Sequence, residues 1–309
     1  MALLFHSQFD DPADWGKHLR EAMPGLDFRV WPEVGNPADI EAALVWKAPE
    51  GELRRFPNLK LIINLGAGVD SIVKDRTLPE GIPIVRIADD EMSRMMSQFV
   101  LAAVLRHYRD FVSFARAQKE KRWHYIHPHE AATCSVGVMG LGNLGGLAAT
   151  ELVRQGFRVA GWARSPKKLD GVESFHGEAG FAPFLARSQI LVAMLPLTPE
   201  TEGILDAKAF SLLPKGAKFV NVGRGQLVDE DALVAALRSG HIAEATLDVV
   251  RTEPLPVDSP LWDMDQVLVT PHLASVAIPR TAARQVAENL RRVAAGEPLL
   301  NVVDPRRGY

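Results

Sequence analysis

The sequence predicts an α/β fold made of two Rossmann-like, doubly wound parallel-sheet domains joined by long helices. Short apolar runs alternate with helical patterns along the chain, and a glycine-rich turn follows the apolar run at 135–139. Alternating strands and helices favour a parallel sheet with helices packed on its faces. The 309 residues are enough for two domains of ordinary size.

The first third of the chain supplies the strands and helices of one domain. Its expected strands are 2–6, 27–31, 43–46, 60–65 and 84–87, and its expected helices are 15–23, 39–43 and 52–55. One long helix is then expected from Asp89 to about Lys121, because this stretch contains no Gly or Pro and begins with acidic residues. A helix of this length often links two domains. A polar, Pro-containing loop follows at 123–129.

A second alternating unit follows that loop. Its expected strands are 135–139, 158–162, 190–194, 218–222, 245–249 and 267–270, and its expected helices are 144–155, 181–186, 207–212 and 230–239. A last helix at 279–295 has no obvious place in this unit and could return to the first. We therefore expect a flavodoxin-like substrate (catalytic) domain over 1–98 plus 279–309, and a Rossmann dinucleotide-binding domain over 99–278.

Composition narrows the class of protein. The formal net charge is −3 and there is no basic run, so we expect neither a nucleic-acid nor a membrane partner. The single cysteine, Cys134, cannot form an internal disulfide, which fits a reducing compartment. The N-terminus has no basic, signal-like region. A cytoplasmic protein is the resulting expectation.

The glycine-rich turn Gly140-Leu-Gly-Asn-Leu-Gly145 predicts a dinucleotide site, because it lies between a strand and a helix. Gly140 permits the tight turn, Gly142 lets the backbone approach a pyrophosphate, and Gly145 lets helix and strand pack closely. The helix N-terminus then offers N–H groups to phosphates.

The end of the next strand indicates which dinucleotide is preferred. It reads Ala163-Arg-Ser-Pro-Lys-Lys168 and has no acid that would bind the ribose hydroxyls of NAD or repel a 2′-phosphate. Arg164 can stack on adenine or bind the phosphate, and Ser165 and Lys167 can add donors. NADP(H) is the expected cofactor, with NAD(H) as the alternative.

Three polar residues follow expected strands of the second domain: Arg224, Glu253 and His272. Ligands of an open parallel sheet bind at the carboxyl ends of its strands, so these residues can converge. Arg224 suits a carboxylate and a keto oxygen, and a histidine, with an unperturbed pKa near ~6.5, can give a proton. Glu253 would orient His272 and favour its protonated form. The trio predicts reduction of a 2-keto acid.

The motifs together resemble those of the D-2-hydroxyacid dehydrogenase family. They are Gly140-Leu-Gly-Asn-Leu-Gly, Asn221-Val-Gly-Arg-Gly, Leu247-Asp-Val with Glu253-Pro-Leu, and Thr270-Pro-His. Further stretches, such as Leu65-Gly-Ala-Gly-Val-Asp-Ser71 and Pro196-Leu-Thr-Pro-Glu-Thr201, are similar to a bacterial subgroup that reduces glyoxylate and hydroxypyruvate.

The resemblance implies further roles. The loop Gly66, Ala67, Gly68 and Val69 would hold the substrate carboxylate through its N–H groups together with Arg224, and Trp46 would border the pocket. Asp248 would bind the nicotinamide carboxamide, and Leu195 and Pro196 would pass along the adenosine. The remaining cofactor contacts would be Asn143, Leu144, Trp162, Thr201, Val222, Gly223 and His272. A homodimer is implied, with the cofactor domains and a crossing arm forming the interface, and with the loop at Trp123 reaching toward the partner's active site.

The expected activity is NADPH-dependent reduction of glyoxylate to glycolate and of hydroxypyruvate to D-glycerate, with His272 as proton donor. Two alternatives stay open. One is a bulkier 2-keto acid such as phenylpyruvate, and the other is a dinucleotide-sensing protein without catalysis. His124, His127 and His129 cluster, but no metal is expected, because no Cys accompanies them and hydride transfer in this family needs none.

Overall fold

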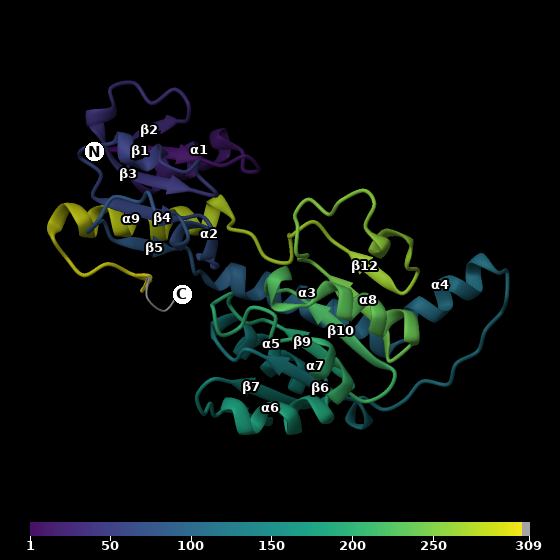
Figure 1. The fold of residues 1–309 in the computed structure, drawn as a ribbon. Coiled ribbons are helices and arrows are strands. Elements are labelled where there is room, and N and C mark those ends of the chain that lie inside the picture. The colour runs from purple at the N-terminus through teal and green to yellow at the C-terminus, as the bar shows by residue number, and fades with distance from the viewer. Residues whose placement is uncertain (305–309) are drawn as a thin grey trace. The chain divides into compact units, whose positions relative to one another are not determined.

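In a computed structural model, which describes residues 1–304, the chain divides into two compact units (Figure 1). Unit 1 contains the chain up to Met92 and again from Val276, and unit 2 runs from Ser93 to Ser275. The chain enters unit 2 inside helix α3 (Asp90–Tyr108). The expected division lay after residue 98, further along that helix, and after residue 278.

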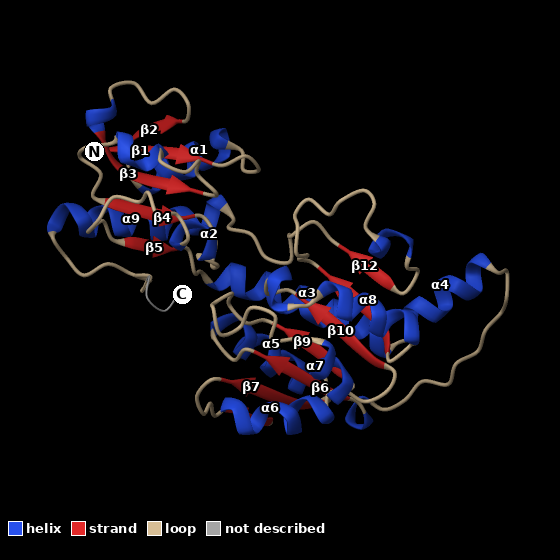
Figure 2. Ribbon diagram, viewed as in Figure 1, coloured by secondary structure: helices blue, strands red, loops and turns tan. Residues whose placement is uncertain are grey.

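Unit 1 is built on a parallel sheet of five strands in the order β2-β1-β3-β4-β5 (Figure 2). Helices α1 and α9 pack on one face, where Trp15 and Leu19 of α1 and Val286 of α9 join Leu3 and Phe5 in one apolar cluster. The last helix of the chain, α9, thus packs with the first one, α1, in unit 1. The bounds are β1 (Ala2–His6), α1 (Pro12–Ala22), β2 (Asp27–Val30), η1 (Pro37–Asp39), β3 (Ile40–Val45), η2 (Glu52–Arg55), β4 (Leu61–Asn64), α2 (Asp70–Val73), β5 (Ile84–Arg86) and α9 (Pro279–Ala295).

The expected helix at 39–43 was wrong. Residues from Ile40 onward form β3, which pairs with β1 on one side and β4 on the other. The run Ile40-Glu-Ala-Ala-Leu-Val45 is short, and its alanines favour a helix, so periodicity alone does not separate the two structures. Burial between two strands decided the outcome, since Ile40, Ala42 and Leu44 are all fully buried.

Unit 2 is built on a parallel sheet of seven strands in the order β12-β11-β10-β9-β6-β7-β8. The strand order reverses between β6 and β9, and ligands of open α/β sheets bind beyond the carboxyl ends of the strands at such a point. The bounds are α4 (Phe111–Lys119), η3 (Ala131–Thr133), β6 (Ser135–Met139), α5 (Asn143–Arg154), β7 (Arg158–Ala163), β8 (Val172–His176), α6 (Gly177–Ala186), β9 (Ile190–Ala193), α7 (Ala207–Leu212), β10 (Ala217–Asn221), η4 (Gly225–Leu227), α8 (Glu230–Ser239), β11 (Ile242–Leu247), η5 (Pro260–Asp263) and β12 (Val267–Val269).

Edge strand β8 was not predicted from the sequence. It reads Val172-Glu-Ser-Phe-His176, and none of its five residues is fully buried. An edge strand with polar side chains lacks the continuous apolar run that marks the buried strands of a parallel sheet. Its position is set by pairing with β7.

The single long helix expected from Asp89 to about Lys121 was also wrong, because the chain breaks between α3 and α4. Asp110 has φ 58°, in the left-handed region, which ends the first helix. The Lys218 ammonium donates to the His107 carbonyl and lies 3.7 Å from the Asp110 carboxylate. These contacts come from β10, more than a hundred residues away, so local sequence does not reveal the break.

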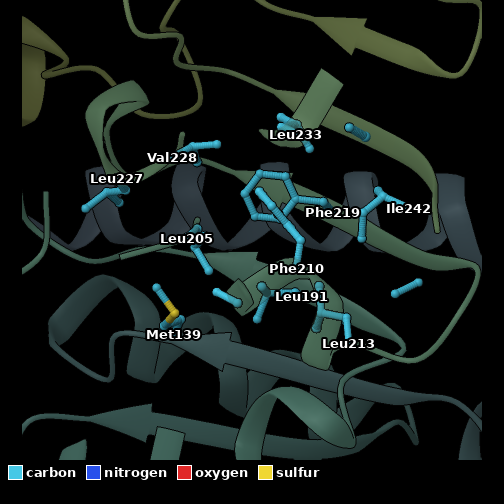
Figure 3. Packing of buried hydrophobic residues seen from close by; sticks show 14 of the residues in the cluster. Met139, Leu191, Leu205, Phe210, Leu213, Phe219, Leu227, Val228, Leu233 and Ile242 are labelled. Atoms are coloured by element: carbon cyan, nitrogen blue, oxygen red, sulfur yellow. The ribbon is translucent and has the colours of Figure 1, made fainter. Parts of the chain in front are cut away.

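Apolar residues fill both faces of the unit 2 sheet. On one face, Leu191 and Phe219 of the sheet pack against Phe210 of α7 and Leu233 of α8 (Figure 3). The rings of Phe210 and Phe219 meet edge to face at 5.6 Å. This packing holds the strand ends that carry the candidate site. In the described part of the chain, no helix is long and apolar enough to cross a membrane.

Candidate active site

The turn between β6 and α5 has the geometry that a dinucleotide site requires. Gly140 has φ 110°, and a Cβ at Gly145 would lie 1.8 Å from the Gly140 carbonyl oxygen, so neither position accepts a side chain. At Gly142, by contrast, no atom lies within 4 Å of the Cβ position. Gly142 caps α5 without a side-chain hydrogen bond. The N–H groups of Asn143 and Leu144, in the first turn of α5, therefore lie next to Gly142, where no side chain blocks the approach of a ligand.

The residues expected to read the 2′-phosphate lie in an exposed turn after β7. Arg164, Ser165 and Lys167 are all exposed. A hydrogen bond from Thr198 lowers the pKa of Glu200, and the charge of Arg164 contributes to the same shift. The turn after β7 is thus near the turn that begins at Pro196.

The turn at Pro196 is braced by Thr201. The Thr201 hydroxyl donates to the Pro196 carbonyl at 2.7 Å and accepts from the Thr198 N–H at 2.8 Å. Leu195, just before it, is almost fully buried. Thr201 therefore shapes this turn, and any contact of its own with a cofactor stays a prediction.

Trp162 is placed differently from what its expected role suggests. Its ring is buried in the apolar cluster of unit 2, and its indole N–H donates to the Gly177 carbonyl at 2.9 Å. The side chain thus makes packing contacts, and a contact between Trp162 and cofactor stays a prediction.

Asn221, at the end of β10, shapes the turn that carries Arg224. Its buried side-chain amide accepts from the Gly223 N–H at 3.1 Å and donates to the Arg224 carbonyl at 3.0 Å. A Cβ at Gly225 would lie 1.9 Å from the Val250 carbonyl carbon, so this position needs glycine. Val222 is buried beside this turn. Asn221 belongs to a predicted motif in which no role was expected of it, although a polar residue at the end of a buried strand is a usable signal.

His272 and Glu253 lie within hydrogen-bonding distance of each other. The His272 Nδ1 atom lies 2.9 Å from Glu253 Oε2, and the side chains are 28% and 27% exposed. A carboxylate at Nδ1 fixes the ring orientation and directs Nε2 the other way. The pair is accessible to solvent, as a proton donor to a substrate must be.

Asp248 holds the turn in which His272 lies. Its carboxylate accepts from the Thr270 hydroxyl at 2.7 Å and from the N–H groups of Leu273 and Ala274 at 3.0 and 2.9 Å. The Asp248 carbonyl also accepts from the His272 N–H at 2.8 Å. His272 has φ 54°, and these bonds stabilise that uncommon backbone conformation. This role of Asp248 was not predicted, because the donors lie more than twenty residues away along the chain. A contact between Asp248 and a carboxamide stays a prediction.

The three expected catalytic residues come from one edge of the unit 2 sheet. Arg224 follows β10, Glu253 follows β11 and His272 follows β12, and these strands are parallel neighbours. Their carboxyl ends therefore lie side by side. A guanidinium and an acid-paired histidine at this edge can bind an anionic carbonyl compound and give a proton to its oxygen.

The expected substrate loop lies in unit 1, at the carboxyl end of β4. Gly66, Ala67 and Gly68 are half-buried and Val69 is buried. A Cβ at Gly66 would lie 2.6 Å from the Trp46 ring, so Trp46 packs directly on this loop. In residues 1–304, no group of three or more His, Cys, Asp or Glu side chains has the arrangement of a metal site.

Comparison with known proteins assigns the chain to a family. Residues 101–274 match the NAD-binding domain of the D-isomer specific 2-hydroxyacid dehydrogenases. This match covers more than half of the chain, and full-length relatives extend it to the rest. The protein belongs to the D-isomer specific 2-hydroxyacid dehydrogenase family, as its motifs predicted.

Individual relatives are similar over the whole chain. Glyoxylate/hydroxypyruvate reductase A of Serratia proteamaculans is 39% identical over 100% of both chains. The crystal structure of a D-isomer specific 2-hydroxyacid dehydrogenase from Xanthobacter autotrophicus, in complex with NADPH and MES, is 60% identical with a TM-score of 0.96, over 100% of this chain and 99% of that one. An NADPH-dependent glyoxylate/hydroxypyruvate reductase from Sinorhizobium meliloti, in complex with NADP and sulfate, is 36% identical with a TM-score of 0.94 over the same shares.

Proposed function

We propose that this protein is an NADPH-dependent reductase of small 2-keto acids, with glyoxylate and hydroxypyruvate as substrates and glycolate and D-glycerate as products. The observation that carries the proposal is the His272–Glu253 pair at the same sheet edge as Arg224. The relatives named for glyoxylate and hydroxypyruvate support the choice of substrate.

The chemistry that the bound dinucleotide supplies is transfer of a hydride to the carbonyl carbon. His272 gives the proton that the carbonyl oxygen needs, from Nε2, while Glu253 holds Nδ1–H. Arg224 binds the anion and stabilises negative charge on the oxygen as the C=O double bond becomes a C–O single bond.

The residues around the glycine turn fit NADP(H). Gly142 leaves room for a pyrophosphate to approach, and α5 presents its N-terminus there. Arg164, Ser165 and Lys167 are exposed and are proposed to bind the 2′-phosphate. Relatives crystallised with NADPH or NADP support this cofactor.

The substrate loop of unit 1, residues 66–69, is proposed to bind the carboxylate, and Trp46 to limit the length of the substrate. The close contact between the Trp46 ring and Gly66 supports the role of Trp46, because the loop itself holds the ring in place.

The direct test is the loss of NADPH absorbance with glyoxylate, hydroxypyruvate, pyruvate and phenylpyruvate, each repeated with NADH. Fast oxidation of NADPH with the first two substrates is expected. Faster turnover of phenylpyruvate would indicate that the substrate is a bulkier 2-keto acid than glyoxylate or hydroxypyruvate. NADPH binding without turnover of any of the four would refute the reductase proposal.

Cofactor preference has its own test. Arg164→Ala is expected to weaken NADPH binding far more than NADH binding. The control is Arg187→Ala, since Arg187 pairs with Glu173 and precedes β9, away from the carboxyl edge of the sheet. Equal losses of both cofactors in Arg164→Ala would place recognition of the 2′-phosphate elsewhere.

We also propose a homodimer in a reducing compartment such as the cytoplasm. Phe111, Trp123 and Tyr125 are 57%, 97% and 76% exposed, and such apolar side chains favour a protein partner. Sedimentation of the wild type and of Trp123→Ser tests the dimer. A monomeric wild type would refute it.

A further inference from the structure

The carbonyl groups of the substrate loop are held by two side chains of unit 1. The Asn64 side-chain NH₂ donates to the carbonyls of Gly66 and Gly68, at 2.7 and 2.9 Å. The Arg86 guanidinium donates to the carbonyl of Ala67, at 3.1 Å. The side chains of these two residues thus donate to three consecutive backbone carbonyls.

This arrangement dictates where the N–H groups of the loop point. The peptide bonds of the loop are trans, and in a trans peptide the C=O and N–H point in opposite directions. The carbonyls of residues 66, 67 and 68 share their peptide groups with the N–H of Ala67, Gly68 and Val69. These three N–H groups therefore point away from Asn64 and Arg86. Within residues 1–304, no backbone carbonyl accepts a hydrogen bond from them.

Asn64 and Arg86 are themselves fixed by the sheet. They end the neighbouring strands β4 and β5 and are partners in the parallel ladder. Asn64 is 1% exposed, and its carbonyl accepts from the Ile87 N–H at 3.1 Å. The backbone carbonyl of Arg86 accepts from the Gln285 side chain of α9 at 2.9 Å. Both side chains therefore act on the loop from a rigid base.

Arg86 also adds charge beneath the loop. Burial lowers the pKa of its guanidinium, but arginine stays protonated in proteins. A cationic donor at the Ala67 carbonyl polarises that peptide group, which makes the attached Gly68 N–H a stronger donor.

We propose that Asn64 and Arg86 are positioning residues for substrate binding: they hold the carbonyls of residues 66–68 inward so that three N–H groups face the carboxylate of the 2-keto acid. This inference rests on the proposed function. A preorganised loop binds the carboxylate equally in the ground state and in the transition state, so its loss raises KM rather than lowering kcat.

The test uses Asn64→Asp and Arg86→Met, with Arg86→Lys as the conservative variant. Asn58→Asp is the matched control, because Asn58 also donates to a backbone carbonyl of unit 1, that of Ala38 at 2.7 Å, but on the surface. KM for glyoxylate is measured together with kcat, the Kd for NADPH and the melting temperature. Calorimetric titration of the NADP-loaded protein with oxalate, a carboxylate that cannot be reduced, reports on the loop without turnover.

We expect KM for glyoxylate and Kd for oxalate to rise about tenfold, or roughly 1.4 kcal/mol, in Asn64→Asp and Arg86→Met. Arg86→Lys should recover part of this loss, while kcat and the Kd for NADPH stay near wild type. Unchanged KM and oxalate affinity in the folded variants would overturn the inference, as would a lower melting temperature with reduced kcat alone. A wild type that binds oxalate but reduces no 2-keto acid would refute the reductase proposal and leave the loop to be judged by the oxalate titration.

Discussion

Unit 2 contains two histidine–glutamate pairs with nearly the same geometry and different surroundings. His272 Nδ1 lies 2.9 Å from Glu253, and His107 Nδ1 lies 2.7 Å from Glu244. The first pair has side chains that are 28% and 27% exposed, whereas the second has 0% and 8%. Burial, and not the hydrogen bond, is what distinguishes the solvent-accessible pair from the pair that is closed to solvent.

The buried pair makes additional contacts that fix it. His107 Nε2 lies 3.0 Å from the Thr246 hydroxyl, so both ring nitrogens have partners in the protein. Desolvation lowers the pKa of His107, opposed by its hydrogen bond to Glu244. Lys218 donates to the His107 carbonyl and lies 4.0 Å from Glu244. The His107 ring thus joins α3 to β11 and stabilises the fold.

The largest expected effect is on the exposed pair. His272→Ala should lower kcat by roughly 10²–10⁴-fold, because a positioned proton donor contributes about that much. The Kd for NADPH and the melting temperature should stay near wild type, as fluorescence titration and calorimetry will show. The control is His18→Ala, a half-buried histidine of α1 that pairs with Glu21. Near-normal turnover of His272→Ala would remove His272 from the proposed mechanism.

The second effect is on stability alone. His107→Ala should lower the free energy of unfolding by on the order of 3 kcal/mol, because it opens a cavity and leaves the buried Glu244 carboxylate without a donor. The folded fraction should keep a kcat near wild type. Urea denaturation and steady-state kinetics of the same preparation measure both. A stable variant with reduced kcat would contradict the division of roles between the two pairs.

Replacing each glutamate by glutamine tests the two pairs separately. Glu253→Gln should lower kcat about 10- to 100-fold, because an amide does not favour the protonated ring as a carboxylate does. Glu244→Gln should leave kcat unchanged and lower the free energy of unfolding by about 1 kcal/mol, since the amide oxygen can still accept from His107. A loss of kcat in both variants would contradict the different roles proposed for the two pairs.

The smallest effect is on the pH dependence of stability. Because the pKa of His107 is lowered below its usual 6.5 in the folded protein, the unfolded state takes up the proton first. The contribution to stability is therefore complete above about pH 6.5 and is lost as pH falls through the folded pKa, at up to about 1.4 kcal/mol per pH unit. His107→Gln should show a shallower decline below pH 6.5 in urea titrations. Parallel curves for the two proteins would mean that other groups dominate.

Most of what could be predicted about the site came from short motifs, whose residues are close together in the sequence. The turn Gly140–Gly145 and the order Arg224, Glu253, His272 identified the family, because each motif is a local segment with a fixed chemical requirement. The supporting residues were not predicted. Asn64 and Arg86 adjoin only through the pairing of β4 with β5, and Asp248 holds the His272 turn from another strand.

Local sequence patterns were enough to predict the α/β class, the strands with continuous apolar runs, the glycine turn and the family. Periodicity and turn chemistry act over a few residues, so they can be read directly. Three features became visible only in the folded chain: Ile40–Val45 is a strand, the long helix breaks at Asp110, and His107 is buried beside Glu244. Each of these depends on burial or on a contact between distant segments, and neither is present in the chain before it folds.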